Sequence, residues 1–223
     1  MIEAVIFDMD GLLVDSEPFW QETERSIMRN FGVEITDEMQ KESFGLSTEE
    51  QIAHWYNYQP WPNPDFPELE RLYNEIMQGF FKTKAELLPG VEYILDFFKK
   101  KKLKIALASS SNMTLINSFI SKFNLAESFD GISSAETEEF AKPHPAVYIK
   151  AAKYLNVKPT NCIAFEDSVH GVIAGKAAKM KVVAIPDKAH FSFPGYLVAD
   201  LKIKSLNEFG EKEFNKINNN SMS

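Results

Sequence analysis

Four short, uninterrupted apolar runs constrain the fold of this 223-residue chain more than any other feature. They are rich in β-branched and small residues, and they occupy 4–7, 105–108, 162–165 and 182–185. Continuous apolar runs of this length are typical of strands buried on both faces, as in a parallel sheet.

Segments with helical periodicity separate the last three runs, at 113–123, 145–155 and 169–180. Pro145 suits the first turn of its helix, because the backbone N–H that proline lacks would have no intrahelical partner there. Alternating strands and helices with right-handed crossovers produce a sheet that is covered by helices on both faces. We therefore predict an α/β fold with a Rossmann-like, doubly wound parallel sheet.

A long stretch after the first strand interrupts this alternation and has helical periodicity only. Its first apolar positions recur every four residues, as on one face of a helix; they are Phe19, Thr23, Ile27 and Phe31. Further helical periods occur at 51–58 and 69–81, and the segment between them contains four prolines, which cannot lie inside a helix.

These patterns predict the domain organisation. We expect an all-helical cap domain at 16–84, inserted after the first strand, and a catalytic core formed by 1–15 and 85–210. The Asn-rich end, 211–223, is expected to be a disordered tail.

Composition and charge exclude several classes of protein. The chain has 32 acidic and 24 basic residues, a net charge of -8, whereas nucleic-acid binders carry basic patches. Its single cysteine, Cys162, permits no intrachain disulfide and no Cys-rich zinc site. No apolar run approaches the roughly 20 residues of a membrane span, and the run at 4–7 is too short for a signal peptide. We expect a monomeric, cytoplasmic enzyme that binds neither nucleic acid nor membranes.

Polar groups gather at the ends of the predicted strands. Carboxylates follow the first and third apolar runs, hydroxyls and an amide follow the second, and one lysine precedes the helix at 145–155. These residues are Asp8, Asp10, Ser109, Ser110, Asn112, Lys142, Glu166 and Asp167. Ligands of open parallel sheets bind beyond the carboxyl ends of the strands, so we expect the eight residues to meet at one edge.

The chemistry of this set points to a phosphate site. Each cluster alone is typical of helix N-caps, but several carboxylates at one edge repel each other unless a cation neutralises them. Oxygen ligands without His or Cys favour Mg²⁺, and a divalent ion beside an ammonium and hydroxyls suits a phosphate group. The sequence contains neither GxxxxGK[ST] nor GxGxxG, so a P-loop or nicotinamide enzyme is not indicated.

Four motifs, in order along the chain, resemble those of the haloacid dehalogenase (HAD) superfamily. They are FDMDGLLVDSE at 7–17, ASSS at 108–111, AKPHP at 141–145 and FEDSVHG at 165–171. The helical insertion resembles the α-helical cap of this superfamily. Within it, the chain is most similar to the sugar and sugar-alcohol phosphatases acting on 2-deoxyglucose 6-phosphate and hexitol phosphates, which are close to the β-phosphoglucomutases.

The resemblance implies a catalytic pair and a metal site. Asp8 would be the nucleophile that forms an aspartyl-phosphate, and Asp10 would be the general acid and base. Mg²⁺ would be bound by the Asp8 carboxylate, the Asp10 carbonyl and Asp167, with Glu166 a weaker ligand acting through water or from a second layer. The expected activity is hydrolysis of small phosphorylated metabolites.

The resemblance also implies a set of phosphate- and substrate-binding residues. Ser109 would hydrogen-bond the phosphoryl oxygens with backbone N–H groups of Ser110 or Asn112, and Lys142 would offset their charge. Two cap residues, Glu17 and Gly45, would face the substrate if the cap closes over the core.

Three alternatives conflict with particular residues. Halide displacement needs no metal-binding acids, so a dehalogenase conflicts with Asp10, Glu166 and Asp167. A binding module without activity would lack Asp8 or Asp10. A β-phosphoglucomutase needs a cap His and basic residues for a second phosphate, whereas 17–20 reads Glu-Pro-Phe-Trp and the loop 45–50 contains no Arg or Lys. Hydrolysis is therefore favoured over the mutase, although the absence of Arg after Gly45 also departs from some sugar phosphatases.

Overall fold

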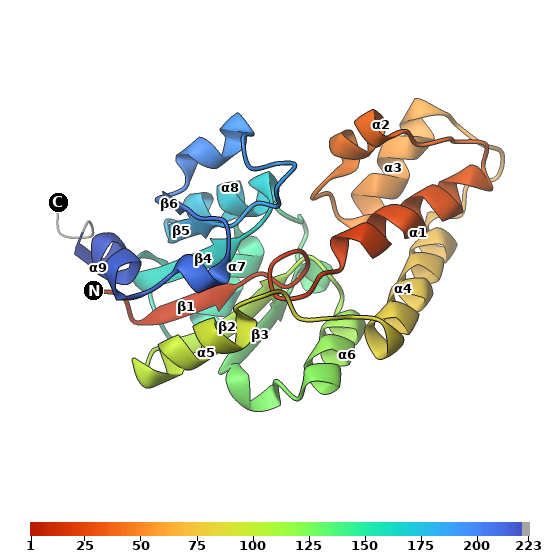
Figure 1. Ribbon diagram of the computed structural model, residues 1–223. Coiled ribbons are helices and arrows are strands. Elements are labelled where there is room, and N and C mark those ends of the chain that lie inside the picture. Colours follow the sequence, from red (N-terminus) through yellow and green to blue (C-terminus); the bar gives the residue numbers. More distant parts are fainter. Residues whose placement is uncertain (220–223) are drawn as a thin grey trace.

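The computed structural model, which describes residues 1–219, contains one parallel sheet with the strand order β3-β2-β1-β4-β5-β6 (Figure 1). The strands are β1 (Ala4–Phe7), β2 (Lys104–Ser109), β3 (Gly131–Ser134), β4 (Cys162–Glu166), β5 (Lys181–Ala184) and β6 (Leu201–Lys202). All four predicted strands are confirmed. Strands β3 and β6 were not predicted, because these two edge strands have no continuous apolar run.

Helices cover both faces of the sheet, as a doubly wound fold requires. On one face, Val5 and Phe7 of β1 pack into a cluster with α5 (Val91–Lys100) and α6 (Met113–Phe123). On the other, β1 packs into a second cluster with α7 (Ala146–Tyr154) and α8 (Val169–Ala177). Because all residues of β1 are buried, the strand has no polar alternation, and its apolar run is continuous.

The cap consists of four helices, which lie to the right of the sheet in Figure 1. They are α1 (Glu17–Arg29), α2 (Asp37–Ser43), α3 (Thr48–Tyr58) and α4 (Phe66–Thr83). Many of their buried side chains form a separate apolar cluster in which Trp55 and Tyr73 are fully enclosed, whereas Met77, Phe80 and Phe81 of α4 belong to the core cluster. The aromatic, proline-rich segment after α3 contributes Trp61 to this cluster, so its role is cap packing.

Two neighbouring segments connect the cap to the core. The backbone N–H of Asp15 donates to the carbonyl of Glu86 (3.1 Å), and that of Leu88 donates to the carbonyl of Leu13 (3.0 Å). At the base of the cap, the rings of Phe19 and Phe80 stack with centroids 3.9 Å apart. The ends of α1 and α4 are thus joined to the core, and the domain boundaries at 16 and 84 stay a prediction.

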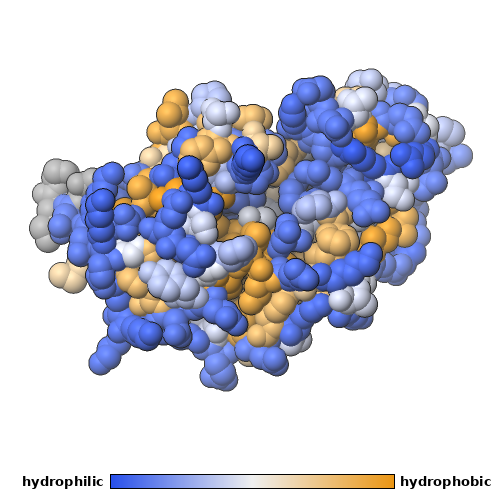
Figure 2. Space-filling view, viewed as in Figure 1, coloured by the Kyte–Doolittle hydropathy of each residue, from blue (hydrophilic) through white to orange (hydrophobic). Residues whose placement is uncertain are grey.

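The surface shown in Figure 2 is largely hydrophilic, with apolar side chains visible in the lower middle of this face and at its upper left. Among the helices of residues 1–219, none combines the length and the apolar character that crossing a bilayer would require.

The expectation of a disordered tail from residue 211 is wrong for 211–219, which form α9 (Glu211–Asn219). Phe214 and Ile217 are buried against the core cluster of α5, although the surrounding residues are polar. The Asn-rich composition concealed this spacing of apolar residues, which places both on one helix face. Residues 220–223 of the predicted tail lie outside the described residues.

We predict that Phe214→Ala lowers the free energy of unfolding by about 3 kcal/mol, because it leaves a cavity beside α5. Chemical denaturation of the purified protein measures this change. The control is Asn215→Ala on the exposed face of α9, which should change stability by less than about 0.5 kcal/mol. Equal effects of the two substitutions would show that α9 is not packed on the core.

Candidate active site

A buried ion pair between Asp8 and Lys142 lies at the carboxyl end of the sheet. The backbone N–H of Asp8 donates to the carbonyl of Phe165 (3.1 Å), which continues the pairing of β1 with β4 beyond the strand. Lys142, from the segment before α7, places its Nζ 2.5 Å from Asp8 Oδ1 and 2.7 Å from Glu166 Oε1. The ammonium also donates to the carbonyl of Ala108 (3.1 Å), so its position is fixed by β1, β2 and β4 together.

Burial and neighbouring charges both shift the pKa values of Asp8 and Lys142. Burial raises the pKa of Asp8 to about 8, although the nearby Lys142 ammonium acts in the opposite direction. Burial alone would lower the pKa of Lys142, but the carboxylates of Asp8 and Glu166 outweigh this effect and raise it. The lysine is therefore a permanent cation, whereas Asp8 needs further positive charge nearby to ionise fully.

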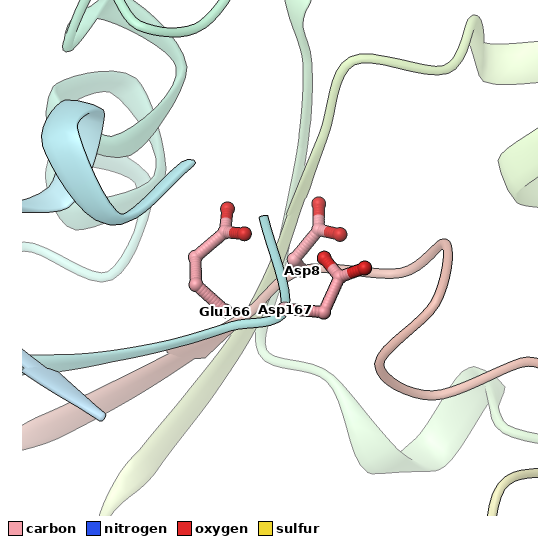
Figure 3. A group of neighbouring side chains, drawn as sticks. All are labelled: Asp8, Glu166 and Asp167. Carbon is pink, nitrogen blue, oxygen red and sulfur yellow. The ribbon is translucent and has the colours of Figure 1, made fainter. Parts of the chain in front are cut away.

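Three carboxylates converge at this point, as Figure 3 shows. Oxygens of Asp8, Glu166 and Asp167 lie within 4.8 Å of one another, and all three residues are buried. Burial, followed by repulsion from Asp8 and Glu166, raises the pKa of Asp167 well above its usual value. Lys142 pairs with two of the three carboxylates, and Asp167 has no ion-pair partner among residues 1–219. This surplus of negative charge and the all-oxygen donor set fit a hard divalent cation.

Glu166 also belongs to a hydrogen-bond network with Lys142 and Tyr148. Its Oε1 accepts hydrogen bonds from Lys142 Nζ and from the hydroxyl of Tyr148, which belongs to α7. The Tyr148 ring also lies beneath the ammonium, 5.0 Å from Nζ to the ring centroid. Glu166 therefore orients Lys142, and Tyr148 orients Glu166.

Two glycines provide the space that these carboxylates occupy. A Cβ at Gly11 would overlap the carboxylate of Asp167, and a Cβ at Gly171 would overlap that of Glu166. Gly11 also has φ of +70°, a conformation that residues with a side chain rarely adopt.

The carboxylate of Asp10 is held by donors from both domains. Ser16 Oγ and Trp20 Nε1, at the start of α1, donate to its Oδ1 at 2.6 and 3.0 Å. Ser111 Oγ, after β2, donates to its Oδ2 at 2.7 Å. Because Ser16 and Trp20 lie at the start of the cap and Ser111 lies in the core, the position of this carboxylate depends on how the cap and the core meet.

A cavity between cap and core contains most of the predicted site residues. Asp8, Asp10, Glu17, Gly45, Ser109, Ser110, Lys142 and Asp167 all line it. The cap loop reaches the core here, where the Phe44 ring stacks on His190 with centroids 4.2 Å apart. Burial raises the pKa of Glu17 to about 7, so the side chain of Glu17 is only partly ionised near neutral pH.

Two predicted residues do not line this cavity. Glu166 lies behind it and contacts Lys142. Asn112 is the N-cap of α6, where its Oδ1 accepts from the backbone N–H of Leu115 (3.0 Å). It lies in an adjoining groove.

Sequence reasoning missed the residues that act on the predicted ones. Ser16 and Trp20 contact Asp10, and Tyr148 contacts Glu166 from a helix 18 residues earlier in the chain. Ser111 belongs to a recognised motif, but nothing in its pattern distinguishes it from Ser109 or Ser110 as the partner of Asp10.

Comparisons with known proteins agree with this fold. Residues 5–185 match the family described as haloacid dehalogenase-like hydrolase. The chain is 39% identical over 214 residues to Hexitol phosphatase B of Escherichia coli (strain K12), covering 95% of this chain and 96% of the relative. It is 31% identical over 180 residues to the Phosphorylated carbohydrates phosphatase of Thermotoga maritima, covering 79% and 82%. The crystal structure of beta-phosphoglucomutase from Clostridium difficile matches with a TM-score of 0.88, 26% identity and 100% coverage of both chains.

The parallel sheet covered by helices is thus the fold of a hydrolase family. The chain belongs to the haloacid dehalogenase-like hydrolase family, and within that family it is a phosphatase. The resemblance based on the four motifs is confirmed.

We predict that Tyr148→Phe lowers kcat about fivefold, because loss of one hydrogen bond of about 1 kcal/mol leaves Glu166 less well positioned. KM should change little, since the phenol lies behind the cavity. Steady-state kinetics with p-nitrophenyl phosphate measures both constants. Tyr154→Phe, on the exposed part of the same helix, is the matched control, and an equal loss in both variants would contradict the proposed role.

Proposed function

We propose that the protein is a Mg²⁺-dependent phosphatase of small phosphorylated metabolites, most specifically sugar or sugar-alcohol monophosphates, and that it acts through an aspartyl-phosphate. The observation that carries this proposal is the Asp8–Lys142 pair at 2.5 Å in a cavity that also contains the Asp10 carboxylate. Relatives named Hexitol phosphatase B and Phosphorylated carbohydrates phosphatase support the substrate class.

The first half-reaction transfers the phosphoryl group to the protein. An oxygen of the Asp8 carboxylate attacks phosphorus as the bond from phosphorus to the ester oxygen breaks. Asp10, in its protonated form, donates a proton to the leaving oxygen, which departs as an alcohol. Lys142 and the polar groups of 109–111 stabilise the negative charge on the phosphoryl oxygens.

The second half-reaction returns Asp8 to its initial state. Asp10, now a carboxylate, removes a proton from water, whose oxygen attacks phosphorus as the bond to Asp8 breaks. Inorganic phosphate leaves, and Asp10 is again protonated. Ser16, Trp20 and Ser111 orient Asp10 through both steps, because each donates a hydrogen bond to its carboxylate.

The donor set supports Mg²⁺ as the cofactor. Asp8 and Asp167 would hold the ion with their carboxylates, Asp10 would contribute its carbonyl, and Glu166 would support the site through Lys142. When bound, the ion supplies positive charge that orients the phosphate and favours the ionised form of Asp8.

The cap side of the cavity favours hydrolysis over phosphosugar mutation. Within the described chain, its lining contains no Lys, Arg or His; it consists of Glu17, Trp20, Phe44, Gly45, Leu46, Ser47, Thr48 and Gln51. A mutase must bind a second phosphate, and none of these side chains provides a cation for it. Water is therefore the acceptor that this cavity suits.

We predict that Asp8→Asn abolishes Mg²⁺-dependent phosphate release, because an amide oxygen is a poor nucleophile and cannot carry the phosphoryl group. The measurement is phosphate release from a panel of hexose, hexitol and nucleotide monophosphates, with Mg²⁺ or with a chelator. Wild type in chelator is the control for metal dependence. Conversion of β-glucose 1-phosphate to glucose 6-phosphate without phosphate release would contradict hydrolysis and favour the mutase.

We also predict that the affinity for Mg²⁺ increases from pH 6 to pH 8. Burial raises the pKa of Asp8 to about 8, so at lower pH the ion must displace a proton, and its apparent affinity falls by up to about tenfold per pH unit. Calorimetry in two buffers of different ionisation enthalpy measures both affinity and proton release. Asp8→Asn should show a weaker pH dependence, and an unchanged affinity across this range in wild type would contradict the prediction.

A further inference from the structure

One glutamine of the cap has hydrogen-bonding capacity that its neighbours do not use. The cap contains five glutamines, and four of them make side-chain hydrogen bonds; these four are Gln21, Gln40, Gln59 and Gln78. The fifth, Gln51, has an enclosed Oε1 that accepts no hydrogen bond from any described residue. Enclosed polar atoms without a partner are uncommon in folded proteins and costly, so this one calls for a reason.

Gln51 belongs to the wall of the catalytic cavity. It lines the cavity together with Thr48, three residues earlier, and the two therefore lie on one face of α3. Glu17 and Trp20, from α1, form the adjoining part of the same wall. Gln51 is thus located where the non-reacting part of a phosphate ester must lie.

The first turns of α3 hold the backbone of Gln51 in a fixed position. Ser47 and Glu50 form a reciprocal capping box: the Ser47 backbone N–H donates to Glu50 Oε2 (2.8 Å), and the Glu50 N–H donates to Ser47 Oγ (3.3 Å). The next residues anchor the other side of the helix, because Ile52 and Trp55 are fully buried in the cap cluster. The wall is therefore organised before a ligand arrives, which reduces the entropy lost on binding.

The chemistry of the wall identifies the class of group that it fits. A carboxamide offers donors and an acceptor but no charge, and a hydroxyl group can satisfy both kinds of atom. A second phosphate would instead require cations, and the neighbouring polar side chains of the wall include the Glu17 carboxyl group and the hydroxyls of Ser47 and Thr48.

On this basis we propose that Gln51 is a specificity-determining residue that hydrogen-bonds a hydroxyl of the sugar or polyol part of the substrate. The inference rests on the proposed phosphatase function and narrows it to neutral, hydroxyl-rich monophosphates. Gln51 is distant in sequence from the four motifs and takes no part in the phosphoryl transfer itself.

The test compares substrates with and without hydroxyls in the Gln51→Met variant, which keeps the length of the side chain and removes its polar atoms. The substrates are sorbitol 6-phosphate, its monodeoxy analogues and p-nitrophenyl phosphate, which has no hydroxyl on its leaving group. We expect kcat/KM for sorbitol 6-phosphate to fall roughly tenfold, as for the loss of one buried hydrogen bond, and that for p-nitrophenyl phosphate to stay within about twofold. Gln78→Met, which removes an amide from α4 outside the cavity, is the matched control.

The monodeoxy analogues identify the substrate hydroxyl that Gln51 contacts. The analogue that lacks the contacted hydroxyl should lose about tenfold in wild type and nothing further in Gln51→Met, whereas a merely structural role would lower all substrates equally. If Gln51→Met does not fold, Gln51→Asn, which withdraws the amide by one methylene, should give the same pattern.

Two results would overturn the inference: an equal loss on p-nitrophenyl phosphate and sorbitol 6-phosphate, or no loss on any sorbitol phosphate. Failure of the proposed function gives a different result, because wild type would then release phosphate from none of the esters, p-nitrophenyl phosphate included.

Discussion

The interaction on which this structure depends is the contact of one buried ammonium with two buried carboxylates. Lys142 lies between Asp8 and Glu166, and its third hydrogen bond goes to the backbone of β2. Charges removed from water in this way are costly unless they are paired with good geometry. The geometry exists because β1 lies between β2 and β4, so that the ends of three strands supply the partners at one point. The apolar clusters on the two faces of the sheet fix those ends.

The residues of the site fall into two groups: one is held in place by the core alone, and the other by the core and the cap together. The core alone holds Asp8, Lys142, Glu166 and Asp167, and it can do so whatever the cap does. The carboxylate of Asp10 is different, because its donors come from the start of α1 as well as from the core. In the proposed mechanism, charge stabilisation is therefore a property of the sheet, whereas proton transfer by Asp10 depends on the relative position of cap and core. Residues of the cap also line the cavity, and in the proposed mechanism they would meet the rest of the substrate.

Structural features that depend only on residues close together in the sequence could be predicted from the sequence alone. Buried strands have continuous apolar runs, and the residues after them must meet at the carboxyl edge, so Asp8, Ser109 and Asp167 could be assigned to one site. Edge strands β3 and β6 and helix α9 could not be predicted in this way, because each buries at most two side chains among polar neighbours.

Contacts between distant segments leave no comparable pattern in the sequence. Asn112 illustrates the limit, since its position after β2 suits either a ligand contact or an N-cap, and only the direction of its side chain decides. The contacts of Trp20 with Asp10 and of Tyr148 with Glu166 likewise depend on how helices pack. Hydrophobic periodicity predicts that a helix exists, but it does not predict which side-chain atoms of the helix contact residues of other elements.

The two glycines beside the carboxylates have a consequence for the evolution of such a site. Gly11 and Gly171 perform no chemistry, yet any side chain at either position would collide with Asp167 or Glu166. Mutational tolerance should therefore be as low at these two positions as at the acidic residues themselves. A survey of natural or laboratory variants that retain activity would find both positions nearly invariant, although neither residue has a functional group.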